Sequence, residues 1–149
     1  MSSLSTRTHH RAARTFSTRT VLILLGATVG AIAVNAVVAG IAVRTGASAS
    51  FPPLTPPVYA AFTVLGVIVG WIGWRIALRR FTRARTVLTL LVPAVTLASF
   101  TPDLVLLITK FIPGTDPTAV VALMTMHVVV VAFAVPGYAL ATARPTGAN

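Results

Sequence analysis

The chain has 149 residues, of which 56% are hydrophobic and 9% are charged. Soluble domains carry about 25% charged residues, so this composition excludes an ordinary soluble protein. The absence of cysteine excludes disulfides, iron–sulfur clusters and thiolate chemistry, and the net charge of +10 has to be interpreted from its position along the chain.

Residues 1–19 precede the first apolar run and are rich in Ser, Thr and Arg. This composition predicts a disordered basic tail on the cytoplasmic side. Two alternatives are an organellar transit peptide and a signal peptide cleaved at the small residues 47–49. The apolar run before that site exceeds the ~7–15 residues of a signal core, which favours an uncleaved first span.

Long apolar runs make up most of the remaining chain. At about 1.5 Å per residue, each run can cross a hydrocarbon layer of about 30 Å as a helix. Because lipid offers the backbone no hydrogen bonds, such runs fold as helices, and their length disfavours a soluble protein with apolar core helices. The predicted fold is an all-α, antiparallel four-helix transmembrane bundle over residues 20–141, with spans at 20–43, 58–78, 86–111 and 118–141 and a short cytoplasmic tail at 142–149.

The basic residues gather on one side of the predicted membrane. Ten arginines lie before the first span, around the connection between the second and third spans, or after the last span, and only Arg44 and Lys110 lie on the opposite side. This is the positive-inside pattern, so both termini are predicted to be cytoplasmic. The arginines would attract anionic lipid headgroups, which are the first predicted partner. Nucleic acid is excluded because no folded basic domain is present to bind it.

The two outside connections differ in composition. Residues 44–57 contain four prolines, which favour a stiff, extended path. Residues 112–117 read IPGTDP, which predicts a compact turn. Asp116 lies just before the last span, where a carboxylate is favourable at a helix N-terminus, so a capping role is predicted for it.

Small residues recur at a spacing of four in the first two spans. Gly26 and Gly30 form one such pair, and Gly66 and Gly70 form the other. Small-xxx-small faces allow helix backbones to approach closely, so we predict that these two spans pack against each other. A homodimer formed through one of these faces is the alternative.

Aromatic residues lie near the ends of the spans. Trp74 and Tyr138 are close to the inner boundary, whereas Phe51, Tyr59 and Phe111 are close to the outer one. Aromatic rings are enriched at the headgroup level of membranes. The sequence therefore predicts an interfacial belt at each boundary.

Polar side chains in three different spans lie at one predicted depth. Asn35, Asp103 and His127 are each eight or nine residues below the outer end of their span, or about 12 Å. A carboxylate inside a membrane is costly and usually has a partner or a task. We predict that the three side chains form a buried polar cluster in a small outward-facing pocket, which is lined in addition by Thr63, Gly66, Ser99 and Thr101.

The predicted cluster has structural and functional interpretations. Asn35 can make an interhelix hydrogen bond, His127 can bond to Asn35 or to a backbone carbonyl, and Asp103 can donate to the carbonyl of Ala98, which Pro102 frees. An Asp–His pair can instead relay protons or bind a small polar or cationic ligand. One His and one Asp are too few for a metal site, and no nucleophile motif is present. We therefore predict no metal, no other cofactor and no enzymatic activity.

Short motifs in the spans resemble a known family. The runs VNAVV at 34–38 and MHVV at 126–129, VP at 135–136 and the Pro-rich outer loop are similar to an actinobacterial family of small four-span membrane proteins, catalogued as a domain of unknown function. The resemblance covers residues 20–141. It implies a bacterial plasma-membrane protein with the Asn and His positions of the family at Asn35 and His127. It implies no activity, and no role for Asp103.

Two functional hypotheses follow. The first is a non-enzymatic, multi-pass plasma-membrane protein that acts through a lipid or an unidentified membrane partner, with Asn35 and His127 as buried polar contacts. The second is a small transporter or proton-linked ligand-binding protein that uses Asn35, Asp103 and His127. A water-accessible pocket that joins the three side chains would favour the second hypothesis, and side chains on separate faces would favour the first.

Overall fold

The computed structural model describes residues 17–143, so residues 1–16 of the predicted basic tail and residues 144–149 of the predicted short C-terminal tail lie outside the described residues. Within the described range the chain is helical and contains no strand. Counting α3 and α4 as one span, four helical segments are long and apolar enough to cross a membrane, which confirms the predicted all-α, four-helix transmembrane fold. The elements are α1 (Thr18–Arg44), the 3-10 turn η1 (Pro52–Leu54), α2 (Pro56–Arg80), α3 (Ala84–Ser99), α4 (Thr101–Thr109) and α5 (Pro117–Thr142).

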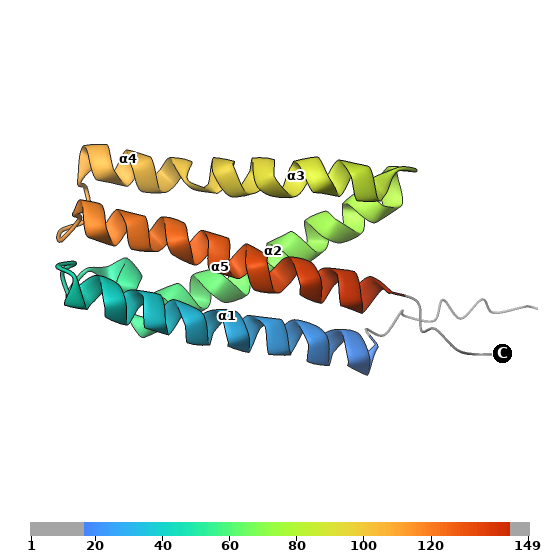
Figure 1. Cartoon of the computed structure of the whole chain (residues 1–149), viewed down its shortest axis with the longest axis horizontal. Helices are drawn as coiled ribbons and strands as arrows, with labels where there is room; N and C mark the ends of the chain where they lie inside the picture. Colours follow the sequence, from blue (N-terminus) through green and yellow to red (C-terminus); the bar gives the residue numbers. More distant parts are fainter. Residues whose placement is uncertain (1–16, 144–149) are drawn as a thin grey trace, which may run out of the picture.

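Helix α5 is the central element of the bundle. It contacts α1, α2, α3, α4 and η1. In Figure 1 it lies between α1 and the nearly continuous rod of α3 and α4, and α2 crosses obliquely behind them. Helices α1 and α3 begin, and α2 and α5 end, at one end of the bundle, which we call the arginine-rich end. The opposite end, with residues 45–55 and 110–116, is the loop end.

Prolines and one carboxylate determine where the helices begin at the loop end. Proline occupies the first turn of both α2 and α5, where its missing N–H would have no intrahelical partner in any case. Asp116 caps α5, because its Oδ1 accepts a hydrogen bond of 2.9 Å from the backbone N–H of Ala119. The predicted capping role of Asp116 is therefore confirmed.

The third span is interrupted near its middle. Helix α3 ends at Ser99 and α4 begins at Thr101, with Phe100 between them. Pro102 lies in the first turn of α4 and has no N–H to continue the helical ladder. The interruption places Asp103 in the first turn of a new helix, which matters for its electrostatics.

The first outside connection is folded rather than extended. Leu54 N–H donates to the carbonyl of Phe51 at 3.1 Å, and Thr55 N–H donates to that of Pro52 at 3.0 Å, which closes the turn η1. The prediction of an extended path is wrong here. The turn directs Phe51 and Leu54 into the bundle, and burial of two large apolar side chains outweighs the preference of the prolines.

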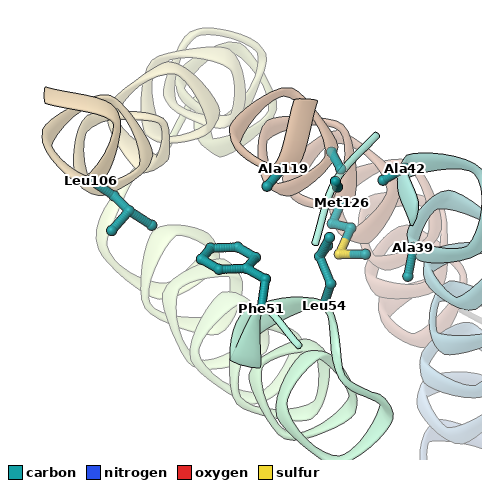
Figure 2. Packing of buried hydrophobic residues seen from close by; sticks show 9 residues of the cluster. Ala39, Ala42, Phe51, Leu54, Leu106, Ala119 and Met126 are labelled. Atoms are coloured by element: carbon teal, nitrogen blue, oxygen red, sulfur yellow. The ribbon is translucent and has the colours of Figure 1, made fainter. Parts of the chain in front are cut away.

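A hydrophobic cluster fills the loop end. Figure 2 shows the Phe51 ring between Leu106 of α4 and Leu54 of η1, with Ala119 of α5 nearby. The Phe51 side chain is fully buried, so its predicted place in the outer aromatic belt is wrong. Phe111 is exposed at the same end, and its place in the outer belt stays a prediction.

Tyr138 joins α5 to α2 in a second cluster. Its hydroxyl donates a 2.6 Å hydrogen bond to the carbonyl of Val67, and its ring centroid lies 5.6 Å from that of Trp71 and 5.7 Å from that of Trp74. The side chain is buried against α2 rather than exposed to the headgroups, and its predicted depth near the inner boundary stays a prediction. Burial of a tyrosine is favourable here because its polar hydroxyl has a hydrogen-bond partner.

The glycine faces of α1 and α2 pack mainly against α5. A methyl group added at Gly30 would lie 2.7 Å from Cε1 of Phe133, and one added at Gly70 would lie 2.5 Å from the Tyr138 hydroxyl. A methyl group at Gly66 would lie 3.5 Å from Val130, and one at Gly26 would meet nothing within 4 Å. The prediction that these faces pack α1 directly against α2 is wrong for Gly30 and Gly70. These two glycines instead make room for aromatic rings of the central helix.

The outward surface of the bundle is apolar on every span. Large aliphatic side chains are exposed along the helices, where they would contact lipid. Examples are Leu22, Ile68, Leu90, Ile108 and Val121.

Candidate functional site

Asn35 and Thr63 form the first buried polar pair. Asn35 lies on α1 and Thr63 on α2, and both side chains are almost fully buried. The amide Nδ2 of Asn35 donates a 3.0 Å hydrogen bond to Oγ1 of Thr63. Oδ1 of Asn35 has no hydrogen-bond partner among the described residues. The pair joins two neighbouring helices at membrane depth.

Asp103 and His127 form the second pair, between α4 and α5. Oδ2 of Asp103 lies 3.2 Å from Nδ1 of His127, and Nδ1 also lies 2.9 Å from the carbonyl oxygen of Leu123. Because a carbonyl only accepts, the Nδ1 proton is directed toward Leu123, one turn back on the same helix. Oδ2 therefore has no well-aligned hydrogen bond although it is within ion-pair distance. The contact is electrostatic rather than a well-formed hydrogen bond.

The two members of the second pair differ in exposure. Asp103 is buried, whereas 38% of the His127 side chain is exposed. The Asp103 carboxyl group lies in the first turn of α4, where the positive end of the helix dipole favours negative charge. The Phe100 ring packs edge-on against the imidazole, with the centroids 6.3 Å apart. The imidazole of α5 and the start of α4 therefore both lie beside the Asp103 carboxyl group.

The predicted polar residues form two pairs, and no hydrogen bond or ion pair within the described residues joins one pair to the other. Ser99 donates to the carbonyl of Thr96 in its own helix at 2.7 Å, and Thr101 is exposed. No member of the predicted cluster lines the groove beside Gly40 or the groove beside Pro93. The contact between Asp103 and His127 is present in the structure. The pocket that was expected to join them to Asn35 remains a prediction.

The sequence interpretation missed a groove at the arginine-rich end. It lies between α2, α3 and α5, has a volume of about 570 Å³, and is lined on its α3 side by Arg85. Ala139 of α5 and Ala143, the residue just after α5, line the opposite side. Small residues at a spacing of four on the last span were the signal that could have indicated it, because such faces leave space beside a helix.

The family assignment rests on most of the chain. Residues 15–144 match the Family of unknown function (DUF6069). The chain belongs to this family. This match confirms the resemblance to a family of unknown function that the short motifs indicated. No curated protein and no solved structure matched the chain.

The first pair provides a direct test of its contribution to the fold. We expect Asn35→Ala and Thr63→Val to show a coupling of about 0.6 kcal/mol, and at most about 1.7 kcal/mol, which is the range for hydrogen bonds between membrane helices. The measurement is the free energy of unfolding of the full chain in mixed micelles, for the two single variants and the double variant.

A matched control for this cycle replaces a threonine that bonds only within its own helix. The Thr96 hydroxyl donates to the carbonyl of Val92 at 2.8 Å. Asn35→Ala and Thr96→Val should therefore be additive, because the two side chains share no partner. Additive effects for Asn35 and Thr63 as well would contradict the bond between α1 and α2.

Proposed function

We propose that this protein is a non-enzymatic, multi-pass protein of a bacterial plasma membrane, and that it acts by binding a lipid or protein partner within the membrane. The proposal rests on the pairing of the polar side chains inside the membrane with one another. Asn35 is paired with Thr63 and Asp103 with His127, and each pair joins two helices. Polar groups used in this way hold a bundle together and leave its outer surface for recognition.

The distribution of charge supports a cytoplasmic position for both termini. Six of the described arginines lie at the arginine-rich end, and only Arg44 and Lys110 lie at the loop end. Excess arginine and lysine on one side is the usual mark of the cytoplasmic face of a plasma membrane. In the whole sequence, eleven of the twelve basic residues are arginine, which is in keeping with a GC-rich bacterial genome.

The Asp–His contact favours a second candidate function, proton-linked transport. Asp103 is buried beside an imidazole that is partly exposed, and its Oδ2 has no aligned donor among residues 17–143. A carboxyl group and a histidine in contact at membrane depth are the parts of a proton relay. The break between α3 and α4 lies next to them, and broken helices at membrane depth are tolerated where neighbouring groups or water satisfy the freed backbone.

Proton entry into vesicles separates the two candidates. The purified full chain is reconstituted in vesicles that enclose a pH-sensitive dye, and a pH gradient and membrane potential are applied. If the Asp–His pair only holds α4 to α5, proton entry will match that of protein-free vesicles for the wild type and for His127→Gln. Faster entry in the wild type that is lost in His127→Gln but retained in Thr63→Val would overturn the first proposal in favour of transport.

Co-extraction tests the partner part of the proposal. The full chain is extracted from its native membrane in polymer discs, and the lipids and proteins in each disc are quantified against the bulk membrane. We expect one lipid class or one protein to be enriched at a fixed ratio to the chain. Discs with the composition of the bulk membrane, and no second protein, would contradict action through a bound partner.

A further inference from the structure

The groove at the arginine-rich end exists because α3 stands away from the central helix. Only Ala84 and Leu88 of α3 are buried, and both lie in its first turns. Beyond them, Val92 is half-buried and Pro93 is exposed, and both line the groove together with Val135 and Ala139 of α5. A volume of about 570 Å³ is therefore left beside the helices, within the span.

The groove is positively charged at one end and apolar along the rest of its length. Arg85 lines it at the end of the bundle, and Leu88, Val92 and Val135 line the part that runs toward the membrane centre. Arg85 and Pro93 are eight residues apart on one helix, or about 12 Å. A matching occupant has a charged group at one end and an apolar chain over the rest.

The cationic end of the groove, at the exposed Arg85, is complementary to an anion. The complete sequence has two acidic side chains, Asp103 and Asp116, and both are remote from Arg85. The neighbouring hydroxyl groups are uncharged and cannot balance the guanidinium; that of Thr89 donates to the carbonyl of Thr86, and that of Thr142 donates to the carbonyl of Tyr138. The guanidinium group is thus left to bind a ligand such as phosphate, for which arginine is well suited.

We infer that the groove holds one anionic glycerophospholipid, with its phosphate against Arg85 and an acyl chain along Leu88, Val92 and Val135. The guanidinium lies at the level of the headgroups of the leaflet on the arginine-rich side, so a lipid of that leaflet enters sideways. This inference rests on the proposed function and names the lipid class that the protein binds.

A second copy of the chain fits the groove less well than a lipid. Copies in one membrane share an orientation, so the neighbour's carboxylates would lie toward its own loop end. Neither Asp103 nor Asp116 of that copy could reach the depth of Arg85. The phosphate of a phospholipid lies at the same depth as Arg85, the cation that lines the groove.

Trp74 serves as a reporter inside the groove. It lines the groove, and the only other tryptophan, Trp71, is buried, so Trp71→Phe leaves a single reporter. The full chain is reconstituted in phosphatidylcholine vesicles that contain equal, small fractions of either brominated phosphatidylglycerol or brominated phosphatidylcholine. Bromine quenches tryptophan on contact. We expect phosphatidylglycerol to be preferred about fivefold, from one arginine at a membrane surface.

Matched variants locate the preference. Arg85→Gln should abolish it, whereas Arg80→Gln, which removes an exposed arginine at the same end but outside the groove, should retain it. Ala139→Phe should fill the groove and reduce quenching by both lipids, while Ala132→Phe, at an exposed alanine on the same helix, should not. Helical circular dichroism and a single elution peak show that each variant is folded.

Several outcomes would overturn the inference. Equal quenching by the two brominated lipids would mean that the groove has no anionic preference, and equal losses in Arg85→Gln and Arg80→Gln would mean diffuse surface charge. Dimers in native mass spectrometry that protect Trp74 from both lipids would assign the groove to a second copy. These results leave the proposed function standing if a partner is co-extracted and the vesicles stay proton-tight. Proton entry that depends on His127 overturns that function whichever lipid quenches Trp74.

Discussion

Phe51→Ala should lower the free energy of unfolding by about 3–5 kcal/mol, the cost of removing a buried aromatic ring from a packed core. The ring is fully buried and packs among side chains from η1, α4 and α5. Its loss would open a cavity where the loop after α1 is attached to the rest of the bundle. The measurement is unfolding of the full chain in mixed micelles, followed by circular dichroism.

Phe111→Ala is the matched control for Phe51. The same residue type at the same end of the bundle is exposed there, so its removal should change the free energy of unfolding by less than about 0.5 kcal/mol. Phe51→Leu should fall between the two, because it leaves a smaller cavity. Equal losses for the two alanine variants would contradict the position of Phe51 in the core.

The contrast between these two phenylalanines shows where the sequence was informative. Both lie beside an outer span end, and position along the chain predicted an interfacial belt for both. Their separation depends on the 3-10 turn after Phe51, which directs its ring inward. Local sequence indicated the loop but not its direction, because long-range contacts with α4 and α5 decide which apolar ring is buried.

The spans themselves were predictable from local physics. Backbone groups in lipid must be satisfied within a segment, so the length of each apolar run determined the number of helices. Pro102 indicated the loss of one helical hydrogen bond next to Asp103, and Asp116 indicated the start of α5, since both act through the backbone of their own helix. The orientation of each helix about its axis depends on other helices, which is why the burial of Tyr138 and the groove were missed.

The polar residues show that the depth of a side chain along its span can be predicted from the sequence, whereas the face of the helix on which it lies cannot. Counting residues placed Asn35, Asp103 and His127 at one depth, and the contact between Asp103 and His127 agrees with that count. Depth alone does not determine which face of a helix a side chain occupies. Asn35 bonds to Thr63 of α2, and its alternative partner His127 instead contacts Asp103.

His127→Leu should destabilise the protein by about 3–5 kcal/mol, because it leaves Asp103 as a buried carboxylate without its partner. Asp103→Leu should cost less, since the imidazole left behind is partly exposed. The double variant Asp103→Leu/His127→Leu should recover most of the stability, because apolar side chains can replace a buried ion pair at little net cost. Unfolding in mixed micelles measures all three variants, and additive losses in the double variant would contradict an ion pair between α4 and α5.

The double variant also separates stability from function. A bundle in which two leucines restore the lost stability has no structural need for a carboxylate at membrane depth. If that folded variant still co-extracts its partner, the pair contributes only to assembly, as the first proposal requires. If proton entry is present in the wild type and absent in the folded double variant, then Asp103 is kept, despite the cost of burying it, because transport needs it. The Asp103–His127 contact is therefore the place where the two proposed functions make opposite predictions for one and the same stable protein.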